Sequence, residues 1–116
     1  MADSRVRLVC PLCDAVVSDG PPPAPGACPG CGARFVGDGE SAPAAVEQGL
    51  SELSVDGVGA QELVNALFTV SPERCRKLGV TIASDEREGF YRWWLFLAAG
   101  RDARDQLETL LAESCK

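Results

Sequence analysis

Six cysteines and no histidine limit the chemistry that this chain can carry out. Four of the cysteines form two pairs, CPLC at residues 10–13 and CPGC at residues 28–31, which are 14 residues apart. A two-residue gap lets both thiolates of a pair reach one ion, and two such turns supply the four tetrahedral ligands of structural zinc. The sequence therefore predicts one structural metal ion, Zn2+, held by Cys10, Cys13, Cys28 and Cys31.

Three other interpretations of the cysteine pairs stay open. Iron also binds in thiolate tetrahedra, and the sequence alone does not separate it from zinc. Redox-active pairs normally begin a helix after a strand, whereas these pairs lie among prolines and glycines. The last interpretation is two disulfides. However, residues 1–9 lack the apolar stretch of a signal peptide, and in a reducing compartment paired cysteines more often hold metal.

Residues that favour strands flank both pairs and are expected to position them. A hairpin is predicted from segments 5–9 and 15–17 around the first pair, and a strand from segment 34–36 after the second. Proline follows the first cysteine of each pair, where its fixed φ helps to shape the turn. Gly32 follows the last cysteine, where a left-handed residue lets backbone amides point at sulfur.

With CPLC, CPGCG and Phe35, the first third of the chain resembles the zinc-ribbon family, which has two rubredoxin-like knuckles. The resemblance implies that the four cysteines ligate the metal. Asp14 departs from the family pattern because a full knuckle has glycine there, so weaker amide-to-sulfur geometry is expected at the first knuckle. Zinc ribbons serve many roles, and the resemblance does not specify a function.

The chain as a whole is predicted to have an α+β fold. A small N-terminal β zinc ribbon is expected at 1–38, a linker at 39–59 with a short helix near 43–53, and a small C-terminal α-helical bundle at 60–116. In the bundle, helices are predicted from 60 to 70, after the cap Ser71, from Ser84 to Gly100, and after the cap Asp102. Cys75 is expected to be buried in a short helix and Cys115 to be exposed.

The aromatic stretch FYRWWLFL at 90–97 has only Arg92 as a polar residue, so a helix there would be hydrophobic nearly all round. In one interpretation it is the central helix of the bundle. In the other, Tyr91, Trp94 and Leu95 stay exposed as a surface for a protein partner or for self-association as a homo-oligomer.

Composition favours a non-enzymatic zinc-binding adaptor with a protein partner. Without histidine, serine–histidine and cysteine–histidine catalysis are absent from this chain, and neither a glycine-rich phosphate loop nor a small-molecule substrate site is evident. The alternative is a nucleic-acid-binding, transcription-related zinc-ribbon regulator, which the net charge of −6 disfavours because phosphates repel an acidic surface. A thiol-dependent enzyme is the third hypothesis.

The longest apolar run, residues 93–99, is too short to cross a bilayer, so no membrane association and a cytoplasmic location are expected. The excess of arginine over lysine, with abundant alanine, glycine and proline, is typical of a GC-rich bacterial gene.

Overall fold

The computed structural model describes residues 8–18, 26–53, 57–87, 90–99 and 102–115. Its elements in chain order are β1 (Leu8–Val9), β2 (Val16–Ser18), β3 (Gly26–Ala27), β4 (Arg34–Gly39), α1 (Ala42–Leu53), α2 (Ala60–Thr69), α3 (Pro72–Leu78), β5 (Val80–Arg87), β6 (Phe90–Leu97) and α4 (Ala103–Ser114). An α+β fold, the predicted class, is therefore confirmed. None of the helices in the described residues is long and apolar enough to span a membrane.

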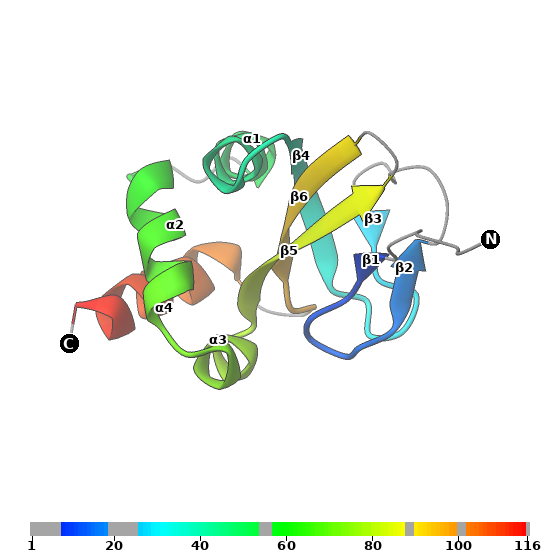
Figure 1. Cartoon of the computed structure of the whole chain (residues 1–116). Coiled ribbons are helices and arrows are strands. Elements are labelled where there is room, and N and C mark those ends of the chain that lie inside the picture. The colour runs from blue at the N-terminus through cyan, green and yellow to red at the C-terminus, as the bar shows by residue number, and fades with distance from the viewer. Residues whose placement is uncertain (1–7, 19–25, 54–56, 88–89, 100–101, 116) are drawn as a thin grey trace.

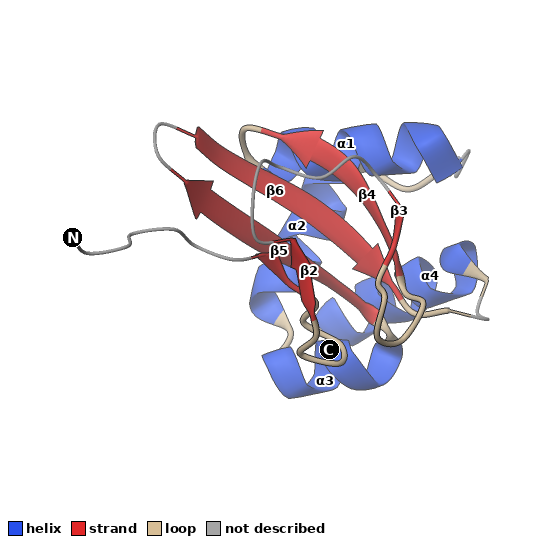
Figure 2. Ribbon diagram, turned by 90° about the vertical axis from the view of Figure 1, so that its right-hand side faces the viewer, coloured by secondary structure: helices blue, strands red, loops and turns tan. Residues whose placement is uncertain are grey.

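Four strands form one antiparallel sheet in the order β3-β4-β6-β5, and β1 pairs with β2 in a separate hairpin. Figure 1 shows the helices on one side of the sheet and the β1–β2 hairpin on the other. In Figure 2 the strands β4, β6 and β5 lie side by side, with helices behind them. The sheet joins β4, near the start of the chain, to strands that follow α3, so it connects segments on both sides of the expected boundaries at 38 and 59.

The predicted helix from Ser84 to Gly100 is wrong, and with it the all-helical bundle. Segment 80–87 is strand β5, and segment 90–97 is strand β6, the central strand between β4 and β5. A strand covered on both faces has a nearly continuous apolar sequence, because successive side chains point to opposite faces and both faces are buried. Periodicity in so short a run does not distinguish such a strand from a buried helix.

The two faces of β6 bury different side chains. Leu95 and Leu97 belong to the core between the sheet and the helices, and Trp93 packs at its margin. Trp94 and Phe96 belong to a second core, which we call the knuckle-side core, between the sheet and the β1–β2 hairpin. The knuckle-side core consists of Leu8, Cys10, Cys28, Ala33, Phe35, Trp94 and Phe96.

This packing corrects the expected partner surface. Trp94 and Leu95 are both completely buried, so the expectation that they are exposed is wrong. Tyr91, on the same face of β6 as Leu95, is 42% exposed.

The helix boundaries agree better with the sequence. The short helix expected near 43–53 is α1, which begins after Ser41, whose side-chain oxygen accepts a hydrogen bond from the Ala44 N–H at 3.3 Å. Ser71 caps α3 and Asp102 caps α4, as predicted. Gly79 ends α3 in the left-handed conformation. These ends depend on local sequence, which explains why they could be read from it.

Candidate metal centre

The four paired cysteines meet at one point, which we call the four-cysteine cluster. Its members are Cys10, Cys13, Cys28 and Cys31, and their Sγ atoms all lie within 4.8 Å of one another. The Sγ atoms of Cys10 and Cys31 are 3.8 Å apart, and those of Cys13 and Cys28 are 3.4 Å apart. Sulfurs about 2.3 Å from a tetrahedral ion are separated by about 3.8 Å, whereas a disulfide joins sulfurs at about 2.05 Å. The spacing fits a metal ion, and all four thiols are free.

The two knuckles have the same backbone pattern. In the first, the Cys10 N–H donates to the Ala15 carbonyl oxygen at 2.9 Å, and the Asp14 N–H donates to the Cys10 carbonyl oxygen at 2.8 Å. The second knuckle repeats both bonds from Cys28 onward, at 2.8 Å and 2.9 Å. Two copies of one turn therefore present their cysteine pairs to a common centre.

Asp14 takes the conformation that glycine takes in the other knuckle. Its φ is +66°, and the φ of Gly32 at the equivalent position is +80°. Aspartate is among the few non-glycine residues that tolerate the left-handed region. The first knuckle therefore keeps the turn geometry despite its departure from the zinc-ribbon pattern.

Gly30 lets the two knuckles approach each other closely. A Cβ atom at this position would lie 2.7 Å from the Ala15 Cβ and 3.1 Å from the Cys13 Sγ, both in the first knuckle. The N–H of Gly30 also donates to the Cys28 Sγ at 3.3 Å. A side chain at position 30 would therefore push apart the sulfurs that must share one ion.

The cluster has one buried side and one open side. Cys10 and Cys28 are buried in the knuckle-side core, Cys13 is half-buried and Cys31 is exposed. Burial raises the pKa of the Cys10 thiol to about 12. Burial also opposes ionisation of Cys28, but hydrogen bonds from the backbone N–H groups of Cys31 and Gly30 and from the neighbouring thiols of the cluster together outweigh it and lower the pKa of Cys28 to about 7. Thiolates bind metal in competition with protons, so ion binding by this cluster is expected to release protons.

Residues of the sheet pack against the buried side of the cluster. Trp94 and Phe96 on β6 and Phe35 on β4 lie in the same core as the buried cysteines, and the rings of Phe35 and Phe96 are 5.4 Å apart. On the outside, the Arg76 guanidinium on α3 pairs with the Asp14 carboxylate at 3.1 Å. Sequence analysis missed both supports, because each joins residues about 60 positions apart.

The other two cysteines lie outside the cluster, with the exposure that was predicted. Cys75 is buried in α3 with its thiol 3.8 Å from the carbonyl oxygen of Val70, and Cys115 is exposed at the end of α4. Burial raises the pKa of Cys75. The burial of Cys75 and its raised pKa are typical of a small apolar core residue rather than a reactive thiol.

Comparison of the chain with protein-family models, with curated proteins and with solved structures finds no match. The resemblance to zinc ribbons therefore depends on the four-cysteine cluster and its two knuckles. What the geometry supports is a metal-binding site of the zinc-ribbon type, in a mixed α+β protein.

Proposed function

We propose that the protein binds one structural Zn2+ ion in the four-cysteine cluster and acts as a non-enzymatic, cytoplasmic interaction protein. The observation that carries the proposal is the convergence of four Sγ atoms within 4.8 Å of one another. We prefer zinc to iron because four-cysteine tetrahedra are the usual form of structural zinc sites.

The ligand set supports a structural rather than a catalytic metal. A catalytic zinc site keeps one position open for water or substrate, whereas four cysteines fill all four positions of a tetrahedron. The ion would therefore hold the two knuckles together and press the buried cysteines against Trp94 and Phe96. On this proposal the metal maintains a shape, and the activity of the protein is recognition.

The surface that we propose for recognition is an aromatic patch formed by Phe68, Tyr91 and Trp93. Phe68 on α2 is 61% exposed and Tyr91 on β6 is 42% exposed. Trp93 lies between them, with its ring 6.1 Å from Phe68 and 5.5 Å from Tyr91, both in edge-on contacts. Exposed aromatic side chains that contact one another are frequent at the centres of protein interfaces. A protein partner or a second copy of the chain would cover the patch.

Charge supports a protein partner over nucleic acid. Arg74 pairs with Glu113 at 3.0 Å. Arg76 is engaged with the first knuckle, and Arg104 lies 3.8 Å from Glu108. These arginines face carboxylates of the same chain, so they offer little free positive charge to phosphates, and the chain carries −6 overall.

The zinc part of the proposal is tested by native mass spectrometry of protein purified without added metal. We expect one zinc per chain in the wild type and in Cys115→Ser, which removes a thiol outside the cluster. Cys31→Ser, which removes an exposed ligand, is expected to lose most of the metal. Fewer than half an equivalent of metal in the wild type would refute the site, and iron in place of zinc would refute the choice of metal.

The interaction part is tested by a pull-down from native cell extract and by light scattering of the purified protein. We compare the wild type with Phe68→Ser and Tyr91→Ser, using Val16→Ser as the control. Val16 is exposed on β2 to the same extent as Tyr91 and lies outside the patch. A partner, or an oligomer, that is lost in the patch variants and kept in the control supports the proposal. A wild type that stays monomeric and captures no protein would refute it.

A further inference from the structure

The four-cysteine cluster differs from a fully enclosed metal site because one of its ligands lies at the surface. Cys10 is completely buried and Cys28 is 3% exposed, whereas Cys13 is half-buried and Cys31 is exposed. The neighbours of Cys31 in segment 29–32 are exposed as well. A small reagent in the solvent therefore has access to one side of the cluster, and the cysteine that it meets there is Cys31.

Each of the more accessible sulfurs has a buried sulfur of the other knuckle as its neighbour. The Sγ atom of Cys31 is 3.8 Å from that of Cys10, and the Sγ atom of Cys13 is 3.4 Å from that of Cys28. A disulfide joins sulfurs at about 2.05 Å, so these pairs would close by about 1.8 Å and about 1.4 Å. The backbones already approach closely at Gly30, where no Cβ atom fits. Each pair thus combines a sulfur that an oxidant reaches with a protected sulfur that reacts next.

Metal binding makes Cys31 more reactive toward an oxidant. A cysteine that ligates a metal is held as the thiolate, which is the form that attacks electrophiles. Exposed thiolates that lie beside a second cysteine are typical of redox-sensing sites, where a peroxide yields a sulfenic acid and then a disulfide. Cys31 combines ligand position, exposure and a neighbouring thiol.

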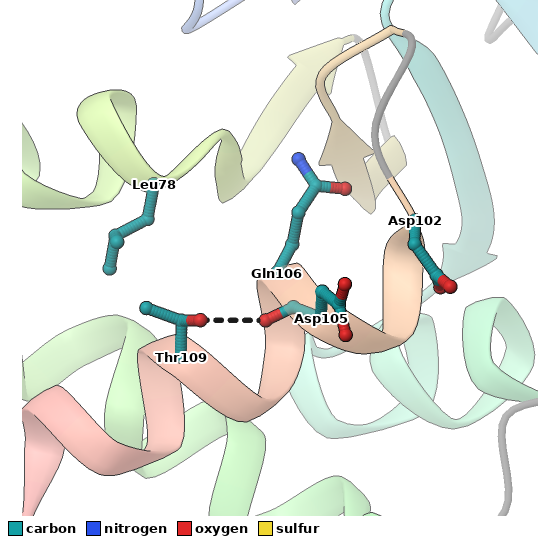
Figure 3. A pocket seen from close by; sticks show the side chains of 5 residues that line it. All are labelled: Leu78, Asp102, Asp105, Gln106 and Thr109. Carbon is teal, nitrogen blue, oxygen red and sulfur yellow. Dashed lines mark hydrogen bonds between the residues drawn. The ribbon is translucent and has the colours of Figure 1, made fainter.

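The two cysteines outside the cluster do not share this combination. Cys115 is exposed but does not belong to the cluster, and Cys75 is buried in α3. A pocket beside α3 does not open onto Cys75, because none of the described residues that line it carries a thiol (Figure 3). The lining residues are Leu78, Asp102, Asp105, Gln106 and Thr109. An oxidant that enters this pocket therefore meets no cysteine.

We propose that the four-cysteine cluster is a modification site for peroxides, at which Cys31 is oxidised first and the disulfides Cys10–Cys31 and Cys13–Cys28 replace the metal. The inference rests on the proposed function, because it requires a bound zinc ion that holds the cysteines as thiolates. It adds regulation to that function, since the amount of metal-bound protein then depends on the peroxide concentration.

The reaction of the first pair has two steps and consumes one hydrogen peroxide. The Cys31 thiolate attacks one peroxide oxygen, so that an S–O bond forms, the O–O bond breaks, and the departing hydroxide takes a proton to become water. The Cys10 thiolate then attacks the sulfur of this sulfenic acid. An S–S bond forms, the S–O bond breaks, and the second hydroxide also leaves as water after taking a proton. The two sulfurs together lose two electrons, and the peroxide is reduced to two waters.

Loss of this pair removes two of the four ligands that structural zinc requires, so the ion is released. Cys13 and Cys28 then react with a second peroxide in the same way. Both disulfides join one knuckle to the other, as the metal did. The oxidised chain therefore keeps its two knuckles together without a metal ion.

The test uses the zinc-loaded full chain with Cys115→Ser, because an exposed thiol outside the cluster would otherwise couple two chains. Native mass spectrometry counts the zinc before and during titration with hydrogen peroxide. Dimedone, which traps sulfenic acids, identifies the cysteine that is oxidised first. An unreduced digest cut at Asp14 and Asp19, which lie between the two cysteine pairs, is then fragmented to map the disulfides. Cys75→Ala in the same background is the control for a thiol outside the cluster.

We expect one zinc per chain before oxidation and complete release after about two peroxides per chain, the stoichiometry of two disulfides. Dimedone should mark Cys31, and the linked peptides should contain Cys10–Cys31 and Cys13–Cys28. A phosphine reductant with added zinc should restore the metal-bound protein, and Cys75→Ala should behave like its parent.

The inference fails if the zinc stays bound in excess peroxide, if the disulfides join cysteines of the same knuckle or pair Cys10 with Cys28, or if Cys31 ends as a sulfinic acid that the reductant does not restore. In each of these cases zinc was bound before oxidation, so the proposed metal site would stand. A chain without zinc before peroxide is added would refute the proposed function, and this inference with it.

Discussion

Removal of the metal from the four-cysteine cluster is expected to unfold the sheet as well as the knuckles. The knuckles form the layer that covers one face of β4 and β6. Between that layer and the sheet, the side chains of Leu8, Phe35, Trp94 and Phe96 are each at most 4% exposed. Without the ion, no disulfide holds the two cysteine pairs together, because all four thiols are free. The cover over these side chains therefore depends on the metal.

The magnitude follows from this burial. Full burial of a large apolar side chain contributes about 1.5–3 kcal/mol, so four of them contribute about 6–12 kcal/mol. Taking about 0.05–0.15 kcal/mol per residue, a chain of 116 residues has a total stability of about 6–17 kcal/mol. The two ranges overlap, although the burial figure is an upper bound because unfolded chains already bury some apolar surface. Loss of the knuckle layer should therefore unfold the whole chain in one cooperative transition.

Fluorescence and circular dichroism measure the two layers separately. The chain has two tryptophans, and Trp93→Phe leaves Trp94 as the only tryptophan, buried in the knuckle-side core. Far-UV circular dichroism reports mainly on the four helices, which lie on the opposite side of the sheet. After chelation of the metal, we expect the emission of Trp94 to shift to the red and the helical signal to fall together. In the metal-bound protein, the two signals should have the same midpoint in urea.

Matched cysteine variants provide the control. Cys31→Ser should behave like the chelated protein, and Cys115→Ser should behave like the metal-bound wild type. A red shift of Trp94 emission with an unchanged helical signal would refute the reasoning, because it would show that the knuckles detach while the sheet and helices stay folded. The same conclusion would follow if Cys31→Ser unfolded at the same urea concentration as Cys115→Ser.

Three further predictions concern single residues. Asp14→Ala should lower the free energy of unfolding, measured in urea, by about 1–2 kcal/mol more than Asp14→Gly does. Both variants lose the ion pair with Arg76, but only alanine is strained at a φ of +66°. Equal free energies of unfolding would contradict the backbone argument. Gly30→Ala should weaken metal binding in competition with a chelator, whereas Gly59→Ala should not, because a Cβ there would come no closer than 3.7 Å to any atom. Since burial raises the pKa of Cys75 above its ordinary 9.0, the thiol ionises first in the unfolded chain, and the wild type should lose stability as the pH rises from about 8 to about 10. Cys75→Ala should lose less stability over this pH range. The prediction would be contradicted if the urea midpoints of the two proteins fell by the same amount as the pH rises.

The parts of the structure that could be predicted from the sequence are those fixed by neighbouring residues. The cysteine spacing identified the cluster, because a two-residue gap brings two thiolates to one ion whatever the rest of the chain does. The caps Ser71 and Asp102 were read correctly because the cap bonds reach only two or three residues along the chain.

The central strand could not be predicted in the same way. Strand β6 is defined by pairing with β4, more than 50 residues earlier, and by two layers that cover its opposite faces. In its sequence this burial is visible only as an apolar run that Arg92 alone interrupts. A buried helix would show the same pattern.

The position of β6 connects the metal site with the proposed recognition surface. The second knuckle ends directly before β4. The hydrogen bond from the Cys28 N–H to the Ala33 carbonyl oxygen therefore sets where that strand begins. Strand β4 then fixes the register of β6, in which Phe35 lies opposite Phe96. Along β6, alternate residues face the cluster or the helices, and Trp93 at the margin of the helix side belongs to the aromatic patch. A metal ion that never touches the patch would thus decide whether the strand that carries two of its three aromatic rings is in place.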